Sequence, residues 1–85
     1  MSWVLLVREK AKKYIARLSK KEQDRISAAL LELSDNPYSG DLVKLEGEDN
    51  LWRRRVGVYR IKFHIDQKRK VIYAYEIKRR SSRTY

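Results

Sequence analysis

Hydrophobic positions follow two different periods along the chain. In its first part, apolar residues recur at i, i+3, i+4 and i+7 over two consecutive segments, which is the spacing of a helix face. The two stripes are Ala11, Tyr14, Ile15 and Leu18, then Ile26, Ala29, Leu30 and Leu33. Later the period falls to two: Tyr59, Ile61, Phe63 and Ile65 alternate with Arg60, Lys62 and His64. The pattern predicts two amphipathic helices followed by an amphipathic strand with one cationic face.

Local signals set the limits of these helices. Ser19 and Glu22 have the spacing of a capping box, in which each side chain accepts a hydrogen bond from an unpaired backbone N–H at a helix start. Asn36-Pro37 ends the second helix, because a residue before proline avoids helical geometry. The tight connection at Ser19 predicts an antiparallel helical hairpin.

The remaining segments predict strands and one long loop. The apolar run Trp3–Val7 is typical of a strand buried on both faces. Leu51–Val56 and the alternating segment meet at Gly57, which predicts adjacent antiparallel strands. Val71–Ile77 is rich in β-branched and aromatic residues and predicts a central strand. Residues 38–50 are acidic and rich in turn formers, so we expect a loop there.

The element order is therefore strand, helix, helix, strand, strand, strand, in a single domain over residues 1–85. This order predicts an α+β fold, in which the two-helix hairpin packs on one face of a mainly antiparallel sheet. The other face of the sheet stays available for a ligand.

Composition excludes several kinds of chemistry. The chain has no cysteine and one histidine, so it forms no disulfide, no thiolate metal site and no cysteine nucleophile. We expect no metal and no cofactor. The apolar run near the N-terminus is too short for the core of a signal peptide, and no stretch approaches the length of a membrane span. The sequence predicts a soluble cytoplasmic protein.

Net charge is distributed unevenly. Residues 1–51 carry nine basic and nine acidic side chains and net to zero, whereas residues 52–85 carry twelve basic against two acidic side chains, for a net charge of +10. Such a cationic half predicts a surface that binds a polyanion. The neutral half is interpreted as the scaffold behind the sheet, with Lys10, Lys12, Lys13 and Arg17 outside the first helical stripe.

Arginines gather on the predicted sheet. Arg53 and Arg55 are two apart on one strand and therefore share a face. Arg60 lies on the non-core face of the next strand, so all three guanidiniums are expected to share one surface, with Arg79, Arg80 and Arg83 leaving the last strand nearby. Guanidinium groups bind phosphate through paired hydrogen bonds and keep their charge. His64 is interpreted as an ordinary strand residue, and Trp3 and Trp52 as packing residues.

Four segments resemble one family. Leu51–Val56, Gly57–Phe63, Val71–Ile77 and Arg79–Tyr85 resemble the RelE/ParE toxin superfamily, and more narrowly its RelE-type messenger-RNA endoribonucleases from toxin–antitoxin modules. The resemblance covers essentially the whole chain, including the helical hairpin. It implies a toxin that enters the ribosomal A site and cuts mRNA there, through attack of a ribose 2′-hydroxyl on the adjacent phosphate. It also implies a cognate antitoxin and the ribosome as partners.

The resemblance assigns roles to individual residues. The catalytic set is Arg53, Arg55, Arg60, Arg79 and Tyr85, and the RNA-binding set is Arg54, Lys62, Arg80 and Arg83. Family members commonly carry lysines where this chain has Arg53 and Arg55. Arginine does not lose its proton in proteins, so neither residue is the general base, and the group that takes the proton is left open.

Two other functions remain as alternatives. The first is a ParE-like toxin that inhibits DNA gyrase and does not cut RNA. Such toxins typically lack the basic residues and the tyrosine, so Arg53, Arg60, Arg79 and Tyr85 argue against it. The second is a non-catalytic module that binds RNA or the ribosome through the same cationic sheet, since phosphate-binding groups serve binding and catalysis alike.

Overall fold

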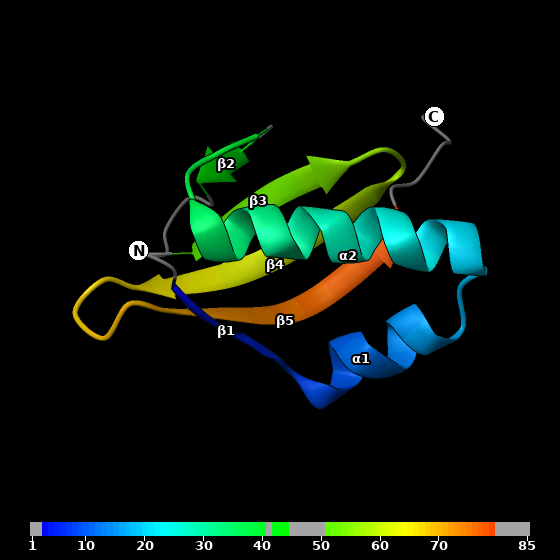
Figure 1. Ribbon diagram of the computed structural model, residues 1–85, viewed down its shortest axis with the longest axis horizontal. Helices are drawn as coiled ribbons and strands as arrows, with labels where there is room; N and C mark the ends of the chain where they lie inside the picture. Colours follow the sequence, from blue (N-terminus) through cyan, green and yellow to red (C-terminus); the bar gives the residue numbers. More distant parts are fainter. Residues whose placement is uncertain (1–2, 41, 45–50, 80–85) are drawn as a thin grey trace.

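A five-stranded sheet forms the centre of the molecule (Figure 1). The computed structural model describes residues 3–40, 42–44 and 51–79. Its elements are β1 (Val4–Val7), α1 (Glu9–Ala16), α2 (Lys20–Asp35), β2 (Leu42–Lys44), β3 (Leu51–Val56), β4 (Tyr59–Asp66) and β5 (Val71–Arg79). The strand order is β1-β5-β4-β3-β2, and every neighbouring pair is antiparallel except β1 and β5, which are parallel. The predicted α+β class is confirmed.

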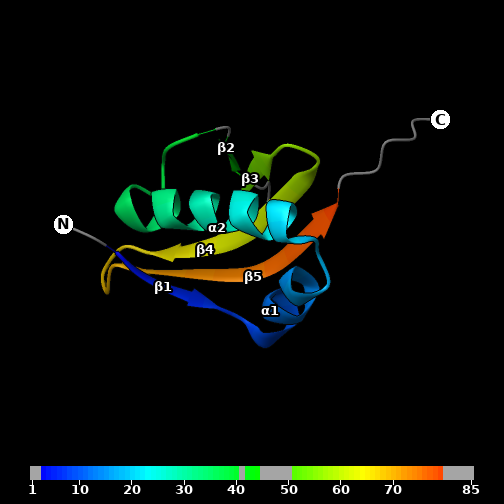
Figure 2. The ribbon, with the colours of Figure 1, turned by 45° about the vertical axis from the view of Figure 1, so that its right-hand side comes forward.

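The two helices occupy different places beside the sheet. α2 runs across one face, and α1 lies next to β5 (Figures 1 and 2). As predicted, α2 follows Ser19, whose Oγ accepts a hydrogen bond of 3.3 Å from the Glu22 N–H. It ends at Asp35, directly before Asn36-Pro37. Within the described ranges, neither helix has the length and apolar character of a membrane span.

The core lies between α2 and the sheet. Ile26 and Leu33 of α2 and the alternating residues Ile61, Phe63 and Ile65 of β4 are fully buried. The α1 stripe packs against the same core, and its Ala11 is fully buried as well. Burying side chains of this size stabilises the fold by roughly 1.5–3 kcal/mol each. The helical and strand periods of the sequence therefore identified the core correctly.

Two local predictions were wrong. β1 is not buried on both faces, because Val4 and Leu6 are 55% and 46% exposed while Leu5 and Val7 pack against the core. β1 lies at the sheet edge, and α2 covers only one face. The predicted loop also contains a strand, β2, which pairs with β3. Three residues are too few for a periodic pattern to reveal.

Gly57 turns the chain between β3 and β4 with a φ of +58°. We predict that Gly57→Ala lowers the free energy of unfolding by about 1–2 kcal/mol, because a side chain in left-handed geometry is strained. For a domain of this size, each kcal/mol lowers the melting temperature by roughly 4–8 °C in a thermal unfolding experiment. The neighbouring exposed Val58 supplies the control, and Val58→Ala should change stability by less than about 0.5 kcal/mol. Equal losses in both variants would contradict the argument.

Candidate nucleic-acid interface

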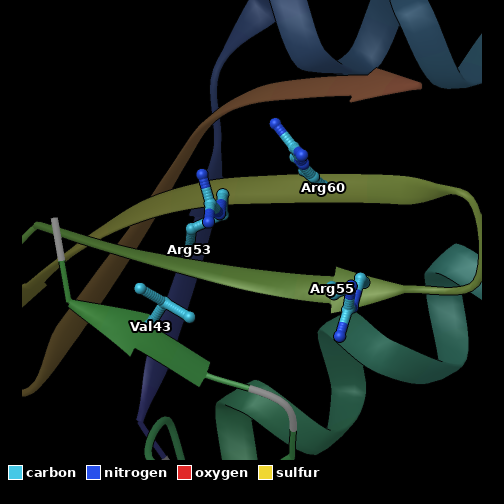
Figure 3. A pocket seen from close by; sticks show the side chains of 4 residues that line it. All are labelled: Val43, Arg53, Arg55 and Arg60. Carbon is cyan, nitrogen blue, oxygen red and sulfur yellow. The ribbon is translucent and has the colours of Figure 1, made fainter. Parts of the chain in front are cut away.

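Three of the predicted arginines meet on the face of the sheet opposite α2. Arg55 pairs directly with Arg60 across β3 and β4, and Arg53 pairs with Lys62. Directly opposed residues point to the same side of a sheet. Val43 of β2 completes a depression of about 250 Å³ lined by these arginines (Figure 3). We call this surface, lined by Val43, Arg53, Arg55 and Arg60, the arginine depression.

The arginine depression brings three positive charges onto one surface. Like charges directly opposite each other on neighbouring strands are destabilising. Among the residues that the structure describes, no carboxylate forms an ion pair with Arg53 or Arg60. Planar guanidiniums held on adjacent strands present paired N–H donors at fixed spacing, which suits the oxygens of a phosphate. The predicted juxtaposition of the three arginines is therefore confirmed, and their roles in RNA binding and catalysis stay predictions.

Arg54 lies on the other face of β3. It is 8% exposed, forms an ion pair with Glu32 of α2, and donates a hydrogen bond of 3.4 Å to the Ala29 carbonyl. Gly40 lies against it, since a Cβ at that position would be 2.6 Å from the Arg54 Nε. Arg54 therefore anchors β3 to α2, and we leave it out of the proposed RNA-binding set. The alternation of side chains along a strand explains the separation from Arg53 and Arg55.

A cluster of lysines around Glu76 lies beside the arginine depression. Glu76 of β5 contacts Lys62 at 3.3 Å, and Lys10 and Lys78 at 3.5 Å each. Its side chain is only 13% exposed. Burial by itself raises the pKa of this carboxyl, but the Lys62 hydrogen bond and the three lysine charges together outweigh burial. The pKa of Glu76 therefore lies below its ordinary value of 4.5.

This depressed pKa predicts a pH dependence of stability. A carboxyl whose pKa falls on folding contributes stability above its ordinary value, and loses that contribution as pH falls through the folded-state pKa. We expect Glu76→Gln to flatten the fall in the free energy of unfolding below pH 4.5, measured by urea denaturation at a series of pH values. Asp35→Asn, at an exposed carboxyl without a lysine contact among the described residues, is the control. An equally flat profile in both variants would count against the lysine cluster.

The remaining predicted site residues, at the C-terminal end of the chain, do not line the arginine depression among the described residues. Lys78 lies opposite Arg60 on β5, whereas Arg79 pairs with the core residue Tyr59 and so leaves the strand end on the helix side. The last strand was predicted to end at Ile77, so Lys78 was not among the predicted site residues. Strand alternation continued past Ile77 would have found it. Arg80, Arg83 and Tyr85 lie outside the described residues.

The remaining predictions concern histidine and tryptophan. His64 lies on the open face opposite Leu51. Its ring contacts the Tyr73 ring in a tilted arrangement, with centroids 6.1 Å apart. Trp3 and Trp52 pack against the core, as predicted. In the described part of the chain, no group of three metal-ligating side chains comes together.

Solved RelE toxins share the fold of this chain. The structure superposes on a chain of the archaeal RelE–RelB complex from Pyrococcus horikoshii OT3 with a TM-score of 0.85 and 27% identity, over 98% of this chain and 100% of that chain. The isolated E. coli RelE toxin gives a TM-score of 0.83 at 17% identity, over 96% and 88% of the two chains. The YoeB/ParE toxin from Agrobacterium tumefaciens gives a TM-score of 0.75 at 13% identity, over 92% of this chain and 99% of that chain.

Family membership follows from the sequence itself. The profile of the ParE toxin family, described as the ParE toxin of the type II toxin–antitoxin system parDE, matches residues 5–83. The chain belongs to this family and is a toxin of a type II toxin–antitoxin module. No protein with a curated description matches the chain.

Proposed function

We propose that this toxin is a ribosome-dependent endoribonuclease that cleaves mRNA in the ribosomal A site and so inhibits translation. The observation that carries the proposal is the arginine depression, in which Arg53, Arg55 and Arg60 line one concave surface on the open face. A site built from guanidiniums is suited to a phosphodiester, whose negative charge increases during the reaction.

The proposed reaction uses a nucleophile from the substrate. The ribose 2′-hydroxyl attacks the adjacent phosphorus, the bond to the 5′-oxygen breaks, and the products are a 2′,3′-cyclic phosphate and a 5′-hydroxyl end. Arg53 and Arg55 are proposed to hold the phosphate in line, and Arg60 to stabilise the charge of the phosphorane. Positioning and charge stabilisation supply most of the rate in such a mechanism, so the site requires no histidine.

The C-terminal residues complete the proposed site. Arg79 leaves the end of β5 on the helix side, so it is proposed to contact the RNA backbone from the edge of the site, next to the phosphate that Arg60 holds. Tyr85 is proposed to stack on the base at the cleavage point or to move the 2′-hydroxyl proton. Lys62, Arg80 and Arg83 are proposed to bind flanking phosphates. Arginine stays protonated, so the acid–base role falls to Tyr85, to the substrate or to the ribosome.

Cleavage of translated mRNA tests the proposal. After induction of the toxin, primer extension should place cuts inside codons held in the A site, and the 5′ ends should accept phosphate from a polynucleotide kinase without prior dephosphorylation. The same mRNA with its start codon removed is the control, because it is not translated and should stay intact. Intact translated mRNA during growth arrest would contradict the proposal and favour a non-catalytic RNA- or ribosome-binding module.

A gyrase-inhibiting toxin is the second candidate function. The observation that favours it is the sequence match to the ParE toxin family over residues 5–83. The arginine depression argues for RNA instead. Double-strand DNA breaks after induction, with intact mRNA, would identify the gyrase inhibitor.

A cognate antitoxin is the proposed protein partner. Solved relatives include RelE in complex with RelB, from Pyrococcus horikoshii OT3 and in the intact E. coli RelBE complex. An acidic antitoxin segment would match the cationic open face in charge. Growth arrest on induction should therefore be relieved by co-expression of the neighbouring open reading frame.

A further inference from the structure

A second cavity lies between α1 and β5, away from Val43, Arg53 and Arg55. Its volume is about 360 Å³. Basic side chains of α1 form one wall, and the end of β5 forms the other. The lining residues, which define the α1–β5 cleft, are Lys10, Lys13, Tyr14, Arg17, Glu76, Ile77 and Lys78. The proposed cleavage mechanism uses none of these residues.

The positive charge of this cleft cannot be seen in the net charge of residues 1–51, which is zero. Residues 8–17 carry five basic side chains against one acidic, whereas residues 18–51 carry four basic against eight acidic. The charges of these two stretches cancel in the net charge of residues 1–51, but the stretches lie in different parts of the fold. Residues 8–17 contain α1, which contacts β5, so the tertiary structure adds its positive charge to that of the cationic half.

Helical spacing directs two cations of α1 and its C-cap residue Arg17 to one side. Lys10, Lys13 and Arg17 follow each other at intervals of three and four residues, and such positions lie on the same helix face. Lys78 faces them from β5. Among the described residues that line the cleft, four are cations and Glu76 is the single carboxylate. The partly buried Tyr14 and the buried Ile77 add apolar surface.

Lysines connect the cleft to the arginine depression. Lys62 pairs across the sheet with Arg53, and Lys78 pairs with Arg60. Both lysines contact Glu76, which also holds Lys10 of α1. Adjacent strands are about 4.8 Å apart, so β3 and β5 are separated by roughly 10 Å. One band of positive charge thus runs from β3 over β4 and β5 to α1.

We propose that the α1–β5 cleft is a second RNA-binding site, which holds the phosphate backbone of an RNA segment away from the scissile phosphate. A polymer with one charge on every repeat fits a band of cations that continues from one cavity into the next. An acidic peptide would fit the cleft alone and would not need this continuity. The proposal rests on the proposed function only in taking RNA as the substrate class.

Binding to a non-cleavable RNA tests the cleft. The probe is a fluorescein-labelled 2′-O-methyl RNA oligonucleotide, and its affinity is measured by fluorescence anisotropy over a series of KCl concentrations. The cleft variant combines Lys10→Gln, Lys13→Gln and Arg17→Gln. The control combines Lys12→Gln, Lys20→Gln and Lys21→Gln, which removes the same charge from exposed positions outside the cleft.

A cleft that binds phosphate gives a specific result. Each phosphate contact with a single strand contributes about 0.7 to the slope of log affinity against log salt, so three lost contacts lower the slope by about 2. We expect the cleft variant to bind about tenfold more weakly or worse, and the control to bind within about threefold of the parent protein. The conservative variant Lys10→Arg, Lys13→Arg, Arg17→Lys should restore binding, which separates lost contacts from lost folding.

Three outcomes would overturn the proposal. Equal losses of RNA affinity in the cleft and control variants would mean that the net positive charge of the protein attracts RNA and that the cleft is not a specific binding site. Failure of the conservative variant to restore binding, in a protein that thermal unfolding shows to be folded, would mean that positive charge at these positions does not hold RNA. A cleft variant that keeps RNA affinity but no longer binds poly-L-glutamate would assign the cleft to an acidic protein segment.

The test is independent of cleavage, because the 2′-O-methyl group removes the nucleophile. If the toxin did not cut mRNA, the proposed function would fail and the binding result would stand. If the toxin does cut, the cleft variant should need a higher ribosome concentration for half-maximal rate and keep the same kcat. A lower kcat at unchanged half-saturation would assign these lysines to the chemistry instead.

Discussion

Replacing Arg60 and Arg79 by alanine together is expected to abolish growth arrest and to lower the rate of mRNA cleavage by about 10⁴-fold. Arg60 lines the arginine depression opposite Arg55. One well-placed donor to a developing negative charge contributes about 10²–10³ in rate, and the loss of a second RNA contact, from Arg79 at the end of β5, lowers the rate further. The measurement is single-turnover cleavage of mRNA on purified, programmed ribosomes, alongside colony counts after induction.

The control must remove the same charge elsewhere. Lys68 and Arg69 lie exposed in the turn between β4 and β5, and their double alanine variant should keep activity within a few-fold. Arg60→Lys keeps the charge but loses the planar fork, so we expect an intermediate rate. Undiminished toxicity in a folded Arg60/Arg79 double variant would remove the catalytic assignment. Thermal unfolding verifies the fold, since Arg79 is exposed and Arg60 is only partly buried.

The second large effect concerns stability and the pairing of Arg54 with Glu32. We expect Glu32→Ala to lower the free energy of unfolding by about 2 kcal/mol, because it leaves a buried guanidinium without its carboxylate. Fully buried pairs lose about 3–5 kcal/mol in such experiments. The smaller figure reflects the Glu32 side chain, which is 60% exposed and admits water to its partner. The Arg54 Nε is already buried without an acceptor in the described structure.

Urea denaturation of matched variants measures this effect. Asp35→Ala removes the same charge from an exposed position on α2 and should change stability by less than about 0.5 kcal/mol. Arg54→Met, added to Glu32→Ala, replaces the cation by an apolar side chain of similar length. We expect this double variant to recover much of the stability that Glu32→Ala loses, because no buried charge is left without a partner. Equal effects of Glu32→Ala and Asp35→Ala would show that the pair contributes nothing beyond surface charge.

Much of the fold followed from periodic patterns. The alternation from Tyr59 to Ile65 identified the core face of β4, and the stripe from Ile26 to Leu33 identified the buried face of α2. These predictions were correct because each pattern reports a single face of one element. Exposed Val4 and Leu6 were predicted wrongly, since an apolar run does not show how many layers cover a sheet.

Part of the site was predictable for the same reason. The spacing of Arg53 and Arg55, with Gly57 ahead of Arg60, was enough to bring three guanidiniums to one surface. Lys78 was missed because the predicted strand ended at Ile77, whereas pairing with β4 extends β5 to Arg79. The pairing of Arg54 with Glu32 joins residues far apart in the chain, and no local pattern indicates it.

The sequence by itself determined both helices and four of the five strands, together with the guanidinium chemistry, because these depend on local spacing and residue type. Tertiary structure alone decided where the charges of the neutral half lie. It placed Lys10 and Lys13 of α1, with the C-cap residue Arg17, beside Lys78 and Glu76 of β5 and so extended the cationic surface. The net charge of a stretch of sequence contains no information on where its charges lie in space. The electrostatic field that acts on a polyanion depends on the distances between those charges.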